Sequence, residues 1–168
     1  MIQRSTIAAL AVSAAVLVGT VLHEGYSDAP YLDSVGVLTI GPGRTDGVKP
    51  GEKTTVQREL VLMLNDMEGR KAAIARCVTV PLYQHELDAY MSLAYNIGTG
   101  AFCGSTLVKK VNAGDYAGAC REILRWNRAG GRVLAGLTKR RQAEYRTCMN
   151  LPAAGTATAD AVKPGGEG

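Results

Sequence analysis

The feature that most constrains this chain is an uncharged run from Ser5 to Leu22, preceded by Arg4 and followed by His23 and Glu24. As one helix these eighteen residues would span about 27 Å, just short of the ~30 Å hydrocarbon core of a bilayer. Positive charge precedes the run, so the rest of the chain is expected on the exported side. The run is only weakly apolar, because it contains Ala8, Ala9, Ala11, Ser13, Ala14, Ala15, Gly19 and Thr20.

Two interpretations of this run stay open. In the first it is a secretory signal peptide, cleaved at one of two poor small-x-small sites, Ser13-Ala14-Ala15 or Val18-Gly19-Thr20. In the second it is an uncleaved anchor, so weakly hydrophobic that it can leave the membrane. Both interpretations place the body of the protein outside the cytoplasm, where its four cysteines are expected to form two disulfides.

The overall composition is that of an ordinary folded protein. Apolar residues make up 46% and charged residues 20% of 168 positions, which suits one domain with a real core and excludes wholesale disorder. The net charge of +4 fits work near anionic surfaces but is too small for a dense nucleic-acid-binding stripe. We expect three segments: an N-terminal signal or anchor segment at 1–22, a folded domain at 23–150 and a disordered tail at 151–168.

A small β-piece is expected directly after the apolar run. Residues 31–48 are rich in glycine and short β-formers, which is typical of a hairpin or meander. The string Thr54-x-x-Gln57 is a capping box and predicts a helix that runs to about Ala75. The residues expected on one face of this helix are Leu60, Leu64 and Met67.

Capping signals divide the remaining chain into further helices. One helix follows Pro81, has Leu87, Met91 and Ala94 on one face, and ends at Gly98. The next three are bounded by Ser105 and Gly114, by Asp115 and the Gly130-Gly131 pair, and by Thr138 and about Met149. The sequence therefore predicts an α+β protein that is mainly helical.

The four cysteines at positions 77, 103, 120 and 148 form no C-x-x-C pair, which argues against zinc ribbons and thioredoxin-like motifs. Four cysteines allow three pairings. We favour Cys120 with Cys148, because the last two helices fold against each other across a short glycine-rich connection. Cys77 and Cys103, which flank the central helix, then form the other bridge.

No metal site or cofactor is expected. His23-Glu24 begins like the zinc motif H-E-x-x-H, but Ser27 stands where the second histidine must be. The remaining chemistry lies in two carboxylates, Glu24 at the end of the apolar run and Asp33 before the strand that contains Thr39. A partly desolvated carboxyl, an ionised carboxylate and a hydroxyl that holds a water can hydrolyse a glycosidic bond. The alternative is that both acids lie on solvated loops and have no such role.

The spacing of these three residues, Glu24-x8-Asp33-x5-Thr39, resembles the catalytic triad of the phage-type lysozymes, glycoside hydrolase family 24. The string H-E-G…Y-L-D-S-V-G-V-L-T-I-G-x-G around them strengthens the resemblance. Further matching segments are Asn96-Ile97-Gly98, Ala101-Phe102-Cys103, Leu107, Asn112-Ala113-Gly114-Asp115-Tyr116, Trp126, Gly130-Gly131 and Gly136-Leu137-x-x-Arg140-Arg141-x-x-Glu144. Together with the weak apolar run, the chain is similar to endolysins whose signal anchor is released from the membrane.

This resemblance implies a lysozyme-like fold with a small β-lobe and a helical lobe, and an activity. The substrate would be the peptidoglycan glycan strand, cut between N-acetylmuramic acid and N-acetylglucosamine. Glu24 would be the general acid, while Asp33 and Thr39 would position the attacking water, with inversion and without a cofactor. The protein would be a monomer anchored in the host inner membrane, amino terminus inside, that moves to the periplasm when a holin acts. The alternatives are a lytic transglycosylase and a non-catalytic wall-binding or membrane-disrupting accessory.

The resemblance also implies supporting residues. Where the family often has histidine after I-G-x-G, this chain has Arg44, and the aspartate that pairs with that histidine is matched by Asp66. We therefore expect an Arg44–Asp66 pair that does not titrate near neutral pH. Tyr95 and Asn96 are the candidates for sugar contact. One of Arg140 and Arg141 is expected to reach back to the catalytic glutamate.

Overall fold

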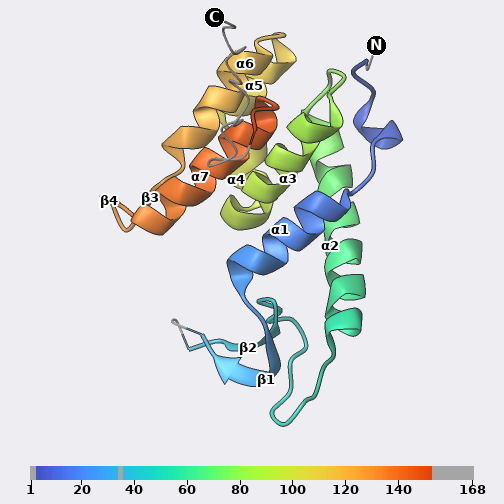
Figure 1. The fold of residues 1–168 in the computed structure, drawn as a ribbon, viewed down its shortest axis with the longest axis vertical. Helices are drawn as coiled ribbons and strands as arrows, with labels where there is room; N and C mark the ends of the chain where they lie inside the picture. The colour runs from blue at the N-terminus through green and yellow to red at the C-terminus, as the bar shows by residue number, and fades with distance from the viewer. Residues whose placement is uncertain (1–2, 34–35, 153–168) are drawn as a thin grey trace, which may run out of the picture.

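The computed structural model describes residues 3–33 and 36–152, with the main chain alone for His23 and Glu24. Within these residues the protein is mostly helical, with two small antiparallel sheets of two strands each. Figure 1 shows the sheet of β1 and β2 at one end of the molecule, the helices α3–α7 at the other, and α2 running between them. This arrangement confirms the α+β, mainly helical class. The predicted tail lies almost wholly outside the described residues.

The N-terminal run packs onto the folded body in two helical pieces. The short helix η1 (Ile7–Ala9) is followed by extended residues and then by α1 (Ala14–Glu24), which Ser13 caps through a hydrogen bond from the Val16 amide. The run is therefore not one continuous helix here. No helix in the described part of the chain is long and apolar enough to span a bilayer.

The β-piece begins earlier than the sequence predicted. Strand β1 (Ser27–Leu32) pairs antiparallel with β2 (Leu38–Gly41), with Tyr31 opposite Thr39. The hairpin itself is as predicted, but only two residues separate the start of β1 from the end of α1. The connection between the two elements is thus short.

The long helix α2 (Val56–Cys77) differs from its prediction in its cap and its buried face. Thr55, not Thr54, caps it by accepting a hydrogen bond from the Arg58 amide. Its buried residues are Glu59, Met63, Met67 and Ile74. Leu60 is only partly buried and Leu64 is exposed, because the buried face of the helix is shifted by one residue from the predicted one.

The later helices follow their predicted capping signals closely. Ser105 and Asp115 cap α5 and α6 as expected, and Gly98 ends α3. The Gly130-Gly131 pair, however, is the turn of a second hairpin, and the last helix begins before Thr138. The observed elements are α3 (Gln84–Ile97), α4 (Thr99–Cys103), α5 (Thr106–Asn112), α6 (Tyr116–Glu122), η2 (Ile123–Arg125), β3 (Arg128–Ala129), β4 (Arg132–Val133) and α7 (Ala135–Cys148).

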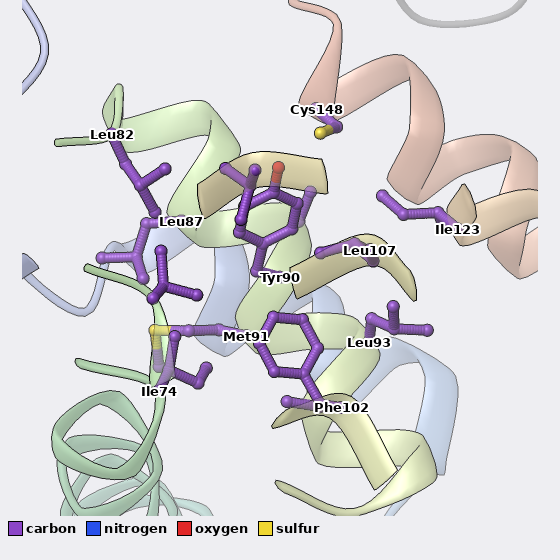
Figure 2. Close-up of a cluster of buried hydrophobic side chains, with 14 of the residues drawn as sticks. Ile74, Leu82, Leu87, Tyr90, Met91, Leu93, Phe102, Leu107, Ile123 and Cys148 are labelled. Atoms are coloured by element: carbon purple, nitrogen blue, oxygen red, sulfur yellow. The ribbon is translucent and has the colours of Figure 1, made fainter. Parts of the chain in front are cut away.

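The hydrophobic core surrounds α3, which contacts α1, α2, α4 and α7. Leu87, Met91 and Ala94 form its buried face, as predicted. Figure 2 shows Tyr90 and Phe102 in the middle of the cluster, with ring centroids 5.8 Å apart. The N-terminal segment belongs to this core: Ile7 and Val16 are buried in it, and Leu10, Val12, Leu17 and Val21 pack against it.

Two disulfides close the helical part. Cys77 pairs with Cys103, and Cys120 pairs with Cys148, which confirms the favoured pairing. The first bridge joins the end of α2 to α4, and the second joins α6 to α7. Both therefore fix the helices that surround α3.

Candidate active site

The candidate site begins where α1 ends. Glu24 is the last residue of α1, and Gly25 ends the helix with a positive φ of 78°, a conformation that suits glycine. The Gly25 amide still donates to the Val21 carbonyl at 3.0 Å. Since β1 starts at Ser27, the main chain of Glu24 lies at the base of the hairpin that carries Asp33 and Thr39.

Val37 links the two other predicted groups. Its amide donates to the Asp33 Oδ1 at 2.8 Å, and its carbonyl accepts from the Asp33 amide at 3.0 Å. The same carbonyl accepts from the Thr39 hydroxyl at 3.0 Å. The structure therefore brings Asp33 and Thr39 together around one residue, Val37. The Asp33 carboxylate is held by the turn, and Thr39 as a residue is buried (3% exposed).

The predicted Arg44–Asp66 pair is wrong. Arg44 instead binds two glutamates: its Nε lies 3.2 and 3.3 Å from the two carboxylate oxygens of Glu59, and its Nη2 lies 2.7 Å from Glu52 Oε1. Asp66 binds Arg70 at 2.7 Å, one turn further along α2. The Glu59 hydrogen bonds raise the pKa of Arg44, and Arg44 in turn lowers the pKa of Glu52.

Packing of the loop after β2 explains why Arg44 binds Glu59 and not Asp66. The Ile40 and Arg44 main chains form a closed bridge, and Gly41 between them has a positive φ of 63°. A Cβ on Gly41 would lie 2.6 Å from Glu59 Cγ, so only glycine lets the loop approach this side chain. Glu59 is 2% exposed and also accepts from the Thr54 hydroxyl at 2.6 Å. The buried carboxylate thus takes the guanidinium that Asp66 was expected to bind.

Arg44 and Asp66 nevertheless line one hollow. This cavity of about 350 Å³ lies between the loop after β2, α2 and the end of α3, and Tyr95 also lines it. The Arg70 guanidinium lies 4.7 Å from the centre of the Tyr95 ring. Asn96 accepts a hydrogen bond from Arg141 Nη2 at 2.8 Å. Tyr95 therefore lies beside an open space, whereas Asn96 is tied to α7.

Arg140 and Arg141 belong to a buried polar cluster between α3 and α7. Arg140 Nε lies 3.2 Å from Glu144 Oε1, and Arg141 Nε lies 3.0 Å from Glu144 Oε2. The Ser92 hydroxyl donates to the same glutamate at 2.7 Å. Burial raises the pKa of Glu144 and lowers that of Arg141. An arginine contact to Glu24 stays a prediction.

Sequence reasoning missed the roles of Glu59, Glu144 and Ser92. The signal for Glu144 was its spacing three and four residues after the two arginines, which places all three on one helix face. The pairing of Glu59 with Arg44 had no such local signal. In the described part of the chain no group of histidine, cysteine or acidic residues lies close enough to hold a metal ion.

Comparison with known proteins identifies a family for the chain. The phage lysozyme family matches residues 21–144. The chain is 40% identical to the endolysin of Acyrthosiphon pisum secondary endosymbiont phage 1 over 126 residues, which is 73% of this chain and 86% of that one. It is 39% identical to the SAR-endolysin of Enterobacteria phage P21 over 127 residues, 75% of this chain and 77% of the relative.

Solved structures give the same result. An endolysin from Escherichia coli O157:H7 phage FAHEc1 superposes with a TM-score of 0.77 at 33% identity, covering 89% of this chain and 99% of that one. A P22 lysozyme mutant superposes with a TM-score of 0.76 at 34% identity, covering 83% and 99%. Fold and relatives define a glycoside hydrolase of the muramidase type. The chain belongs to the phage lysozyme family.

Proposed function

We propose that this endolysin hydrolyses the bond between N-acetylmuramic acid and N-acetylglucosamine in peptidoglycan, with Glu24 as the general acid. The observation that carries the proposal is that one residue, Val37, hydrogen-bonds both Asp33 and Thr39 on the hairpin that follows Glu24. A glycosidase needs a proton donor on one side of the scissile bond and a group that activates water on the other. The hairpin carries the candidates for the second group.

In this mechanism Glu24 protonates the leaving glycosidic oxygen. Asp33 accepts a proton from the attacking water, and Thr39 helps to orient that water. An inverting reaction leaves room for one water between the two carboxyl groups. Val37 supports this role, because its amide fixes the Asp33 carboxylate and its carbonyl fixes the Thr39 hydroxyl.

Replacement of Glu24 by glutamine tests the acid. The amide keeps the shape but delivers no proton, so Glu24→Gln is expected to lose at least a hundredfold in activity on purified peptidoglycan, within the roughly 10²–10⁴ typical of general acid catalysis. Asp33→Asn is expected to be severely impaired as well. The matched control is Glu68→Gln, which changes an exposed glutamate on α2 and should retain full activity. More than a few per cent of activity in Glu24→Gln would show that the acid is assigned wrongly.

Mass spectrometry of the products separates hydrolysis from lytic transglycosylation. A hydrolase leaves reducing muramic acid ends, whereas a transglycosylase leaves anhydro ends that are lighter by one water. A transglycosylase needs a single glutamate, so the Asp33–Val37–Thr39 arrangement favours hydrolysis. Anhydro products would contradict the proposed reaction.

The same proposal includes release from the inner membrane into the periplasm. The segment 5–22 would first lie in the bilayer, with the amino terminus in the cytoplasm, and would leave when a holin collapses the membrane potential. Two observations support this. Ile7 and Val16 are buried in the core, so removal of the segment would leave a cavity. The outward positions of α1 are apolar: Ala14, Ala15, Val18 and Leu22.

The mass of the soluble periplasmic protein tests release against cleavage. Release without cleavage predicts a soluble, active form with the same mass as the membrane-bound form. A soluble form that lacks residues 1–22 would establish a cleaved signal peptide instead.

A further inference from the structure

Arg4, the positive residue before the apolar run, is bound by three side chains of the body. Its Nε and Nη2 donate to the two carboxylate oxygens of Glu86 at 3.1 and 2.7 Å. Its guanidinium carbon lies 3.6 Å from the centre of the Tyr116 ring and 4.3 Å from that of Tyr83. A planar, delocalised cation fits such a site better than an ammonium group, because it can bind a carboxylate through two parallel bonds and stack on aromatic rings.

Hydrogen bonds within the body also hold the side chains of this site. Tyr83 caps α3 and Glu86 lies in its first turn, and the Glu86 carboxylate accepts from the Tyr83 amide at 2.8 Å. Tyr116 begins α6, and its hydroxyl donates to the Pro81 carbonyl at 3.0 Å. The site is therefore preorganised by two helix starts that the chain brings together.

Arg4 also directly precedes the residues that dock the N-terminal segment on the body. Directly after it, the Ser5 and Leu82 main chains exchange two hydrogen bonds of 2.8 Å each, and Ile7 then enters the core. Glu86 is only 3% exposed, so without Arg4 it would be a buried carboxylate whose charge has lost its partner. The charge of buried Glu86 is therefore compensated only when Arg4 and the residues that follow it are docked on the body.

We infer that Tyr83, Glu86 and Tyr116 form a guanidinium-binding site whose ligand is Arg4, and that filling this site locks the N-terminal segment onto the body. The cellular meaning rests on the proposed release: while segment 5–22 spans the membrane, Arg4 and the site lie on opposite sides of it. The site is then filled only after the amino terminus has crossed, and its occupation opposes return to the bilayer.

Hydrogen exchange on the full chain, refolded without lipid, tests the lock directly. The reporter amides are Ser5 and Leu82, which form the bridge, and those of α1. Arg4→Gln is expected to speed their exchange roughly 10- to 100-fold, as for loss of charge-assisted hydrogen bonds. Arg4→Lys, which keeps the charge but not the two-bond geometry, should give an intermediate increase. The control Arg132→Gln removes the same charge from an exposed site on β4 and should change nothing.

A double variant identifies the partner. In the Glu86→Gln background, Arg4→Gln should have a much smaller effect on the reporter amides than in the wild type. If Arg4→Gln leaves exchange at Ser5 and Leu82 unchanged, or if the effects of the two substitutions simply add, the inferred site is wrong. Peptidoglycan hydrolysis by the same refolded wild type is measured in parallel. An inactive wild type with the expected exchange pattern would contradict the proposed function and leave the lock supported.

Discussion

Three glutamates, Glu59, Glu86 and Glu144, are almost fully buried, and each one is paired with arginine. A buried carboxylate is costly unless it is paired and hydrogen-bonded. Glu59 and Glu86 also lie in the first turns of α2 and α3, where the helix dipole favours negative charge. Their partners join segments 15 and 82 residues apart in sequence. The ion pairs of Glu59 and Glu86 therefore fix tertiary contacts that no local pattern encodes.

At the site, the sequence correctly predicted the arrangement of residues within a short hairpin. It failed to predict an ion pair whose partner is selected by burial. Asp33 and Thr39 are close in sequence, and the turn between them places both on Val37. The pairing of Arg44 with Asp66 failed because Glu59 is more deeply buried and closer to the loop that carries Arg44. Packing determines which of several acidic residues on a helix pairs with a distant arginine, and sequence spacing does not predict the partner.

Asp88 gives a residue-scale prediction about pH. It lies on α3 beside α1, where burial raises its pKa and a hydrogen bond from Gln84 at 2.8 Å offsets this in part. A raised pKa in the folded state means that the protonated form favours folding. The associated stability is present below the usual value of about 3.9 and is lost as pH rises through the raised pKa.

Asp88→Asn should therefore raise the Tm at neutral pH. The advantage over the wild type should shrink as pH falls through the raised pKa and vanish below about pH 3.9, where both side chains are neutral. Thermal unfolding across this range measures it. A difference that stays constant with pH would mean that the charge of Asp88 does not affect stability.

At the scale of elements, capping residues predicted helix boundaries well, and buried faces were harder to predict. Ser105, Asp115 and Gly98 act where their local chemistry indicates. Thr54 has the same chemistry as Thr55, but its hydroxyl binds Glu59 and the next residue becomes the cap. The Gly130-Gly131 pair ends no helix, because two glycines with positive φ also suit a hairpin turn.

The two disulfides give an element-scale prediction. Cys77–Cys103 and Cys120–Cys148 close loops of similar length, with sequence separations of 26 and 28. Loop closure alone should stabilise each by about 3 kcal/mol. Cys120 and Cys148 are only 1% and 2% exposed, so replacing this pair by alanine also leaves a small cavity. Its loss should cost more than loss of the partly buried Cys77–Cys103 pair.

Denaturant unfolding of the two alanine pairs checks this order. The expected result is a lower free energy of unfolding for both, with the larger decrease for Cys120→Ala/Cys148→Ala. An equal or reversed order would show that packing around the buried bridge adds nothing to the effect of the closed loop.

At the scale of the whole molecule, the proposed release requires one segment to suit two environments. Residues 5–22 carry no charge, as a membrane segment requires, yet they supply Ile7 and Val16 to the core and lead directly into Glu24. A more apolar segment would bind the bilayer too firmly, and a more polar one would not insert. Under this proposal, the small residues that made the sequence interpretation ambiguous keep both states accessible.

The last prediction follows from this balance. Ala9, Ala11 and Ala14 are exposed in the folded protein, so leucine at these positions should leave the lipid-free enzyme active. In the membrane, three leucines favour insertion by ~1–2 kcal/mol, roughly tenfold in partition. The triple variant should therefore accumulate in the membrane fraction and delay lysis. The matched control places leucine at Ala72, Ala101 and Ala113, which are also exposed but lie outside the segment. Lysis on schedule by the first triple variant would contradict membrane retention as the switch.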